Sequence, residues 1–515
     1  MGGRFVINLS SFVRLHARRT PDKTAIVFGE CRITWRMLAQ RIEQTAGWLR
    51  QRGIRADDIV AVFMKNSPAL LELAFAASHI GAVFLPINYR LAGDEVGYIT
   101  THAGANLLIA DKEFAPTVQG LPNVVLVDAA ARVDSTRLCP GAPAAEMLAR
   151  QPGDLFRLMY TSGTTARPKG VVHTYENFYW KSADHILCLG LTAATRLLIV
   201  GPLYHVGAFD LPGIAVLWLG GTIVLQREFD AGAVLDAIEA ENIEGIWLAP
   251  VMTGALLAEA ARKSRRVASL RWVIGGGDRT PESRIRAFAE AFPAARYIDA
   301  YGLTETCSGD TFMEAGHEIA KIGSVGRPVA HLEIRIVNDD GAPLPAGENG
   351  EICLRGPKVT RGYWHDPERT RASFLGDWFR TGDVGYLDED GFLFLTDRKK
   401  DLIVSGGENI ASSEIERVLY DLPLIAEAAV IGVPDERWGE IPLAVVVMAE
   451  GAAFEPLAIL AHCRAKLAGF KVPKVIVRRD TLPRNPSGKI LKRMLREEIA
   501  GRVTALPPSG GTIPP

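Results

Sequence analysis

The chain has 515 residues, of which 48% are hydrophobic and 23% are charged, and its formal net charge is -1. This length exceeds that of one ordinary domain, so we expect two or more domains with substantial cores. The balanced charge gives no general attraction to nucleic acid, and we expect small-molecule partners.

The six cysteines are scattered without a C-x-x-C pair, which argues against a disulfide framework and a zinc site and favours a cytoplasmic location. We find no targeting segment in the N-terminal residues. The most apolar stretches, residues 71–87 and 211–225, are too short or too interrupted to span a bilayer. We expect them to be buried passages from helix to strand, the first with Ser67 as N-cap and Pro68 opening the helix.

Strand-like and helical patterns alternate along the first part of the chain, which favours parallel sheets covered by helices. Residues 59–63 precede a helix, and residues 222–225, 231–241 and 245–248 are expected to form strand, helix and strand. From about Leu332 the pattern changes to short strands, with Asp340-Gly341 and Asp390-Gly391 as reversals. The predicted fold is therefore α/β, with a β-rich subdomain within the larger domain.

A mixed pattern follows Lys400, where we place a domain boundary. Ser413-x-x-Glu416 fits a capping box at the start of a helix. We therefore expect a large domain over residues 1–399, a small α+β domain over 400–504, and a disordered Pro/Gly-rich tail over 505–515.

The segment from Tyr160 to Gly170 has the composition of a phosphate-binding loop. It contains glycines that let backbone N–H groups converge on an anion, hydroxyls that donate hydrogen bonds, and Lys169, whose ammonium offsets charge. It departs from the G-x-x-x-x-G-K-[ST] form, because Lys169 is followed by glycine. The alternative is a solvated turn, in which the same residue types are common.

Three further charged residues suit nucleotide chemistry, and each has a plainer alternative. Glu305 follows a Tyr-Gly turn after a strand, where a carboxylate suits Mg²⁺, although carboxylates on loops are common. Asp383 lies in an Arg-Thr-Gly-Asp turn and could accept hydrogen bonds from a ribose diol or simply cap the turn. Lys489 precedes a charged helical run over residues 490–499, so by itself it fits a solvated surface.

Two further segments carry weaker signals. Gly275-Gly276-Gly277-Asp278 follows a strand-like run, and a glycine turn that ends a strand explains it equally well. His205 lies beside an apolar segment and is as readily structural as functional. Asp210 and Asp278 leave a polar feature of the substrate open.

Tyr160 to Gly170 resembles the signature loop of the adenylate-forming superfamily, with Ala166 where glycine is usual. Four further motifs resemble those of the same superfamily in the same order, so that the resemblance covers nearly the whole chain. They begin at Tyr301 (YGLTE), Trp378 (WFRTGD), Asp397 (DRKKD) and Asn485 (NPSGK).

The resemblance implies an AMP-forming acyl-CoA synthetase that uses Mg·ATP, a fatty or aryl carboxylic acid, and CoA. The catalytic residues would be Lys489, Thr165, Glu305 and His205, with Glu305 and Thr161 on the magnesium. The nucleotide would contact residues spread over all five motifs and the glycine turn: Thr161, Ser162, Gly163, Thr164, Thr165, Lys169, Gly276, Gly277, Asp278, Tyr301, Gly302, Thr304, Asp383, Arg398 and Lys489.

The remaining implied roles concern the acid, CoA and domain rotation. The acyl pocket would be formed by His205, Val206, Gly207, Gly276, Tyr301 and Gly302. The CoA tunnel would be lined by Ser405, Gly406, Gly407 and Glu408. Lys400 would be the hinge about which the small domain rotates between half-reactions.

Two other functions remain open at this point. One is an adenylation enzyme that loads an amino or aryl acid onto a carrier protein, although amino-acid members place an aspartate where this chain has His205. The other is an inactive nucleotide-binding regulator, although Lys169, Glu305, Asp383, Arg398 and Lys489 are all present. The sequence also leaves the oligomeric state open, including a homo-oligomer.

Overall fold

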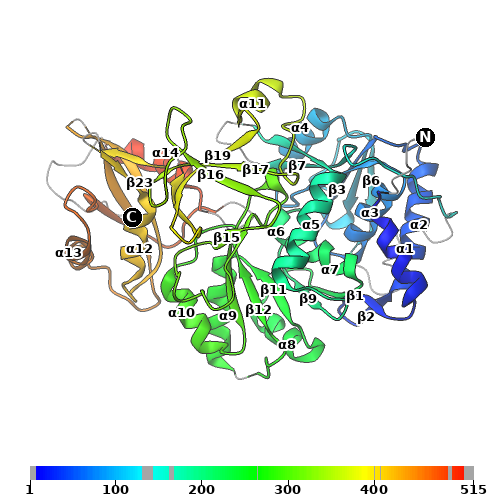
Figure 1. The fold of residues 1–515 in the computed structure, drawn as a ribbon, viewed down its shortest axis with the longest axis horizontal. Helices are drawn as coiled ribbons and strands as arrows, with labels where there is room; N and C mark the ends of the chain where they lie inside the picture. The colour runs from blue at the N-terminus through cyan, green and yellow to red at the C-terminus, as the bar shows by residue number, and fades with distance from the viewer. Residues whose placement is uncertain are drawn as a thin grey trace.

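The computed structural model describes residues 7–129, 143–161, 167–263, 265–398, 401–405, 408–435, 437–484 and 490–503. A large N-terminal part, blue to yellow in Figure 1, adjoins a smaller C-terminal part in orange and red. Lys400, at the expected domain boundary, and the tail 505–515 lie outside the described residues. No helix in the described ranges is long and apolar enough to cross a membrane.

Two largely parallel sheets form the larger part, as the alternating pattern predicts. One has six strands in the order β6-β5-β3-β4-β7-β8, and its final pair is antiparallel. Its strands, in chain order, are β3 (Ile59–Phe63), β4 (Val83–Ile87), β5 (Leu107–Asp111), β6 (Val124–Val127), β7 (Leu155–Thr161) and β8 (Lys169–Thr174).

The other sheet has nine strands in the order β15-β14-β13-β12-β11-β9-β10-β1-β2. The run from β13 to β1 is parallel, whereas β2, β14 and β15 pair antiparallel at the two ends. Its strands are β1 (Thr24–Phe28), β2 (Cys31–Thr34), β9 (Arg196–Ile199), β10 (Thr222–Leu225), β11 (Gly245–Leu248), β12 (Trp272–Gly275), β13 (Arg296–Tyr301), β14 (Thr311–Phe312) and β15 (Arg327–Pro328).

Helices cover both sheets and lie between their strands in the sequence. They are α1 (Ser10–Arg19), α2 (Trp35–Gln51), α3 (Pro68–His79), α4 (Gly93–Ala103), α5 (Tyr175–Leu189), α6 (Val206–Phe209), α7 (Gly213–Leu219), α8 (Ala231–Glu241), α9 (Pro250–Arg262) and α10 (Glu282–Ala291), with short 3-10 turns η1 (Lys112–Phe114) and η2 (Thr304–Thr306). Helix α3 begins as predicted, because the Ser67 hydroxyl accepts the Leu70 N–H and Pro68 occupies the first turn.

The predicted β-rich subdomain is a five-stranded antiparallel sheet. It contains β16 (Glu333–Val337), β17 (Gly350–Arg355), β18 (Phe374–Leu375), β19 (Trp378–Leu387) and β20 (Leu393–Arg398), with α11 (Pro367–Ala372) before β18. Asp340-Gly341 and Asp390-Gly391 lie in the reversals between β16 and β17 and between β19 and β20, and both glycines have positive φ.

The C-terminal part is a second five-stranded sheet flanked by helices. Its elements are β21 (Ile403–Ser405), β22 (Glu408–Ile410), α12 (Ser412–Tyr420), β23 (Ile425–Asp435), β24 (Gly439–Met448), α13 (Pro456–Lys466), β25 (Val475–Arg479) and α14 (Lys492–Val503).

The predicted capping box at Ser413 is wrong. Ala411 is the N-cap of α12 and makes no side-chain capping hydrogen bond, whereas Asp397 Oδ2 accepts the Ser412 backbone N–H at 2.6 Å. The Ser412 hydroxyl also donates to Asp397 Oδ2 at 2.6 Å, while Glu416 accepts the Val430 N–H at 2.7 Å. The Ser413 hydroxyl donates to the Thr396 carbonyl on β20, so both predicted capping residues bond to neighbouring strands, because tertiary contacts compete with local capping.

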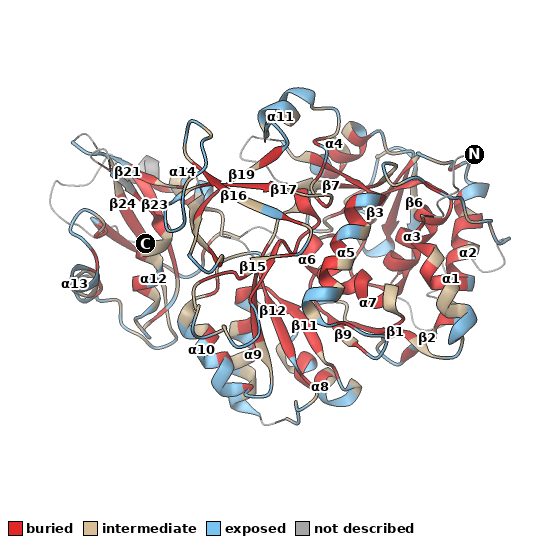
Figure 2. Cartoon of the chain, in the orientation of Figure 1, coloured by how far each residue is buried: buried red, intermediate tan, exposed pale blue. Residues whose placement is uncertain are grey.

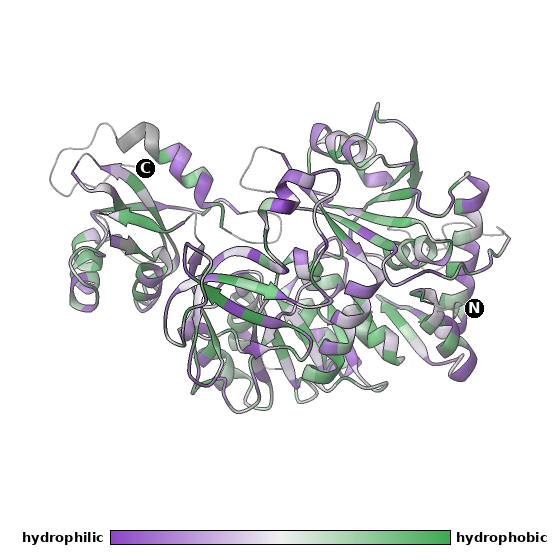
Figure 3. Cartoon of the chain, turned by 45° about the horizontal axis from the view of Figure 1, so that its top comes forward, coloured by the Kyte–Doolittle hydropathy of each residue, from purple (hydrophilic) through white to green (hydrophobic). Residues whose placement is uncertain are grey.

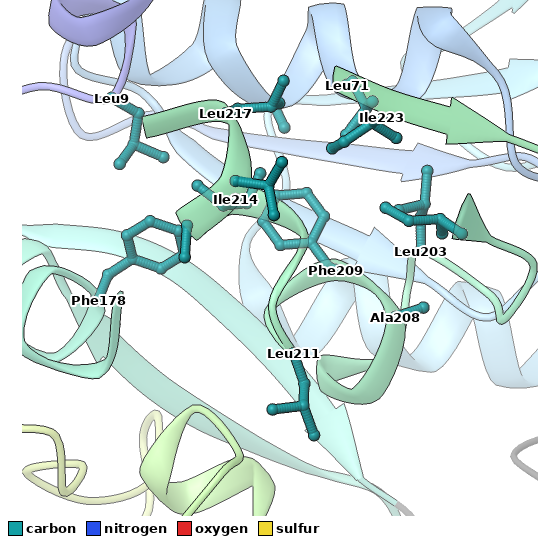
Figure 4. Packing of buried hydrophobic residues seen from close by; sticks show 14 of the residues in the cluster. Leu9, Leu71, Phe178, Leu203, Ala208, Phe209, Leu211, Ile214, Leu217 and Ile223 are labelled. Atoms are coloured by element: carbon teal, nitrogen blue, oxygen red, sulfur yellow. The ribbon is translucent and has the colours of Figure 1, made fainter. Parts of the chain in front are cut away.

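The buried apolar residues lie mainly on the strands of the sheets and on the helix faces that pack against them. Figure 2 shows the central strands as buried and the outward faces of many helices as exposed, and Figure 3 shows apolar residues concentrated on the same strands. Residues 211–225 form the predicted buried passage, α7 followed by β10. Figure 4 shows Ile214, Leu217 and Ile223 from this region in one apolar cluster with Leu71 and Phe209.

Candidate active site

The two ends of the predicted phosphate loop lie opposite each other. Thr161 ends β7 and Lys169 begins β8, and the two residues pair directly in the antiparallel register. The Thr161 hydroxyl is buried, with no hydrogen-bond partner among the described residues. Between them, Ser162, Gly163, Thr164, Thr165 and Ala166 lie outside the described residues.

Lys169 and Glu305, which are far apart in the sequence, meet at this point. The Lys169 ammonium lies 2.9 Å from Glu305 Oε1, and Tyr363 joins the two residues. Its hydroxyl oxygen lies 2.8 Å from Lys169 Nζ and 2.9 Å from Glu305 Oε1. Burial, with the negative charge of Glu305 added, raises the pKa of Tyr363, so the phenol stays protonated and donates to the carboxylate. Sequence reasoning missed Tyr363, which no motif contains.

The buried side chain of Lys358 binds the loop that follows Glu305. Lys358 Nζ donates to the carbonyls of Ser308 and Gly309 at 2.9 and 2.6 Å and lies 2.8 Å from Asp310 Oδ1. Gly302 is needed because a Cβ there would lie 2.4 Å from the Gly309 backbone nitrogen. The loop is therefore fixed before any ligand arrives.

A second support for the loop is an ionic cluster without solvent exposure. Asp210 lies 2.7 Å from Arg157 and 3.2 Å from Lys181, and all three side chains are 0% exposed. Burial alone would raise the pKa of Asp210, but the two cations hold it below its ordinary value. Asp210 therefore balances internal charge, and it does not supply the polar contact with the substrate that the sequence left open.

His173 connects this cluster to the loop. Its Nδ1 accepts hydrogen bonds from Arg157, which assigns the ring proton to Nε2, and Nε2 donates to the Thr304 carbonyl at 2.6 Å. Burial, with repulsion from Arg157 added, lowers the pKa of His173 to about 3. The imidazole is thus neutral and orients the backbone of Thr304 beside Glu305.

Asp383, the residue predicted to bind the ribose, contacts Tyr301 of the motif that contains Glu305. The Tyr301 hydroxyl donates to Asp383 Oδ2 at 2.8 Å, and Asp383 pairs in register with Arg398 on β20. Asp383 was expected in a turn, but it lies within the long strand β19, where Gly382 has a φ of 72°. Positive φ at one glycine permits this irregularity without ending the strand.

The glycine turn after β12 lies beside this site. A Cβ at Gly276 would lie 3.2 Å from the Ala300 carbonyl, next to Tyr301. Gly277 and Asp278 continue to the rim of a cavity, and Asp278 Oδ1 accepts the Arg279 N–H. Asp299, which sequence reasoning missed, is buried on β13 opposite Gly275, and burial raises its pKa to about 7 although Arg279 opposes this.

His205 caps the short helix α6, which contains Val206 and Gly207. Its Nδ1 accepts the Gly207 N–H at 3.0 Å, so the ring proton is assigned to Nε2. Burial lowers the pKa of His205 to about 4, so the imidazole is neutral near pH 7. The ring lies 6.2 Å from that of Trp247, which sequence reasoning also missed.

A cavity of about 530 Å³ lies between the large part and the C-terminal part. It is bounded by the turn at Gly277 and Asp278 and by α12 and β23. Arg484 and Ile490, which flank the segment of Lys489, also line it and pair through an isolated bridge. Lys489 itself lies outside the described residues.

The other residues predicted on the small domain are only partly described. Ser405 ends β21 and is buried, and Glu408 begins β22 and is exposed. Gly406 and Gly407, between the two strands, lie outside the described residues, as does Lys400.

The residues present fit a magnesium ion that arrives with ATP. Among the described residues no group of three or more His, Cys, Asp or Glu side chains could hold a metal by itself. Mg²⁺ usually keeps several waters and takes one or two protein oxygens besides the phosphates. Glu305 and the unpartnered Thr161 hydroxyl match that limited demand.

Family models match the chain over most of its length. Residues 13–364 match the AMP-binding enzyme model, and residues 414–489 match the AMP-binding enzyme C-terminal domain model.

Relatives with curated names match nearly end to end. A feruloyl-CoA synthase from Amycolatopsis is 38% identical, over 95% of this chain and 99% of that protein. A long-chain-fatty-acid–CoA ligase from Mycobacterium tuberculosis is 34% identical, over 96% of this chain and 99% of that protein. The structure of O-succinylbenzoate coenzyme A synthetase from Bacillus subtilis, with ATP and magnesium, superposes with a TM-score of 0.85 at 31% identity, over 94% of this chain and 98% of that one.

Proposed function

The chain belongs to the AMP-binding enzymes as an AMP-forming acyl-CoA synthetase, and we propose that it activates an apolar carboxylic acid, fatty or aryl, with Mg·ATP and transfers the acyl group to CoA. The observation that carries this proposal is the ion pair of Lys169 with Glu305 where the phosphate loop ends, with Thr161 paired in register opposite Lys169. A cation, a hard anion and a hydroxyl that has no partner among the described residues suit a magnesium-bound polyphosphate.

In the first half-reaction a carboxylate oxygen of the acid attacks the α-phosphorus of ATP. The bond from the α-phosphorus to the bridging oxygen breaks, and pyrophosphate leaves with the electron pair. Lys169 and the loop hydroxyls, with Thr165 among them, bind the phosphates, and Asp383 and Arg398 bind the ribose side. Bound magnesium would offset the charge of the phosphates.

Lys489 is proposed to reach the carboxylate and the α-phosphate from the small domain. Its flanking residues line the cavity that also reaches Gly277 and Asp278, which supports this assignment. A preorganised donor where charge develops contributes about 3 kcal/mol to transition-state stabilisation. His205 is neutral, so it contributes a hydrogen bond from Nε2 and no counter-charge.

In the second half-reaction the CoA thiol, as thiolate, attacks the acyl carbonyl, and AMP leaves with the electron pair of the C–O bond. We assign Ser405, Gly406, Gly407 and Glu408 to the pantetheine path. Lys400 is proposed as the hinge that exchanges this segment with that of Lys489.

Two observations argue against the alternative function of an amino-acid adenylation enzyme. Such an enzyme needs a carboxylate for the substrate ammonium, but His205 is neutral and Asp210 already balances Arg157 and Lys181.

The test is release of AMP and pyrophosphate from Mg·ATP across fatty, aryl and amino acids, with and without CoA. AMP release that requires both an acid and CoA, with formation of an acyl-CoA, supports the synthetase. Pyrophosphate exchange without a thioester would favour carrier-protein loading, and no turnover with any acid would favour a regulator.

A further inference from the structure

The indole of Trp247 lies against three glycines from separate segments. Trp247 is on β11 and is only 5% exposed. A Cβ built at Gly201 would lie 2.7 Å from Trp247 Cζ3, and one at Gly207 would lie 2.5 Å from Cζ2. A Cβ at Gly276 would lie 3.5 Å from the indole Nε1. The indole therefore fills the space that side chains at Gly201 and Gly207 would occupy, and it lies at contact distance from Gly276.

Backbone conformation does not explain these glycines. Gly201, Gly207 and Gly276 are all outside the positive-φ range that favours glycine. At Gly201 and Gly207 a methyl group would overlap the indole, so the space that Trp247 occupies accounts for both.

Trp247 borders the expected acid site. Gly207 and Gly276 belong to the acyl pocket predicted from the sequence, and the His205 ring lies nearly parallel to the indole, at 28°. Gly276 is also next to the Ala300 carbonyl, one residue before Tyr301. The indole thus contacts residues of the expected acid site and also residues of the neighbouring strand β9.

The space behind the indole is filled. A narrow apolar slot there has no room for a water molecule. It is lined by Leu197, Leu198, Ile199, Val200, Gly201, Ala208 and Leu211 besides Trp247. Figure 4 shows Ala208 and Leu211 beside the buried cluster around Phe209. An acyl chain that passed the indole would therefore have to displace packed side chains.

We propose that Trp247 is the end wall of the acyl pocket and restricts the substrate to short, planar acids, with aryl acids preferred over long saturated fatty acids. This inference rests on the proposed function of the same site. An aryl acid is short enough to end against the indole, whereas a long methylene chain needs depth that the filled slot does not offer.

The test compares kcat/KM for cinnamic acid and hexadecanoic acid, measured by CoA-dependent AMP release. We expect the wild type to favour cinnamic acid by at least about tenfold, because single pocket contacts discriminate by about 10–200-fold. Trp247→Ala opens the pocket, and the preference should shift toward hexadecanoic acid by about tenfold or more. Trp247→Leu keeps apolar bulk and should lose part of the aryl preference, and it serves if the alanine variant does not fold.

Trp272→Ala is the matched control. Trp272 begins the neighbouring strand β12, is 7% exposed, and covers Gly245 as Trp247 covers Gly207. It lies at the opposite end of β12 from Gly276. Trp272→Ala therefore removes a buried indole without enlarging the acyl pocket. The acid preference of this variant should stay within about twofold of the wild type.

The outcomes distinguish failure of the proposed role of Trp247 from failure of the proposed synthetase activity. The role of Trp247 is refuted if the wild type uses hexadecanoic acid as well as cinnamic acid. It is also refuted if neither Trp247 variant shifts the acid preference relative to Trp272→Ala. In both cases the proposed synthetase activity is unaffected. If no acid in the panel of the previous section supports AMP release, both are refuted.

Discussion

Asp210→Asn should destabilise the large part of the chain severely, because one carboxylate balances two cations in a fully buried cluster. Asp210 lies 2.7 Å from Arg157 and 3.2 Å from Lys181. Removing one partner of a buried ion pair costs about 3–5 kcal/mol of folding stability. Asp210→Asn leaves both Arg157 and Lys181 without their counter-charge, so we expect a cost near the upper end of that range. A domain has about 5–15 kcal/mol of stability in total, so much of it would be lost.

Urea unfolding measures this cost, provided that the transition of the large part is fitted separately from that of the small domain. Asp390→Asn is the control, because Asp390 pairs with Lys321 at the surface, where its side chain is 62% exposed, and should cost at most about 1 kcal/mol.

The deficit should also depend on pH. Burial already lowers the pKa of Lys181 below 10.5, and loss of Asp210 lowers it further. The folded variant then binds fewer protons than the unfolded chain, so its deficit should shrink as pH rises toward 10.5. A cost below about 1 kcal/mol, together with an altered acid preference, would refute the structural role of Asp210.

Two further predictions concern the residues around Glu305. His173 has a pKa of about 3 when folded against 6.5 ordinarily, so its stabilising contribution is present above pH 6.5 and is lost as pH falls, by up to about 1.4 kcal/mol per pH unit. His173→Gln should flatten the fall in the urea midpoint between about pH 6.5 and 4, and a profile parallel to that of the wild type would contradict this. Glu305→Gln should lower AMP release about a hundredfold and raise the Mg²⁺ concentration required, with Glu314→Gln as an exposed control. An unchanged magnesium dependence would remove Glu305 from the metal.

Local patterns predicted the parts of the fold that local physics determines. The Ser67 cap, the strands at 222–225 and 245–248, and the reversals at Gly341 and Gly391 follow from periodicity and turn chemistry. The capping box at Ser413 failed, because the Ser413 hydroxyl donates to the Thr396 carbonyl and Glu416 accepts the Val430 N–H.

The site was predictable only where residues lie in motifs. Lys169, Glu305 and Asp383 were predicted in this way, and the structure shows which side chains they contact. Tyr363, Asp299 and Trp247 lie far from their partners in the sequence, so no spacing signals them. The burial of Asp210 was equally invisible, because an aspartate beside an apolar helix looks the same whether it faces a substrate or two cations.

The most direct test of the central claim follows the oxygen of the acid. An acid labelled with oxygen-18 in both carboxylate positions is turned over with Mg·ATP and CoA, and the AMP is analysed by mass spectrometry. Attack of the carboxylate on the α-phosphorus predicts one labelled oxygen in each AMP and none in pyrophosphate, with both products lost in Lys489→Ala. Unlabelled AMP, or label in pyrophosphate, would contradict the acyl-adenylate and with it the assignment of this site.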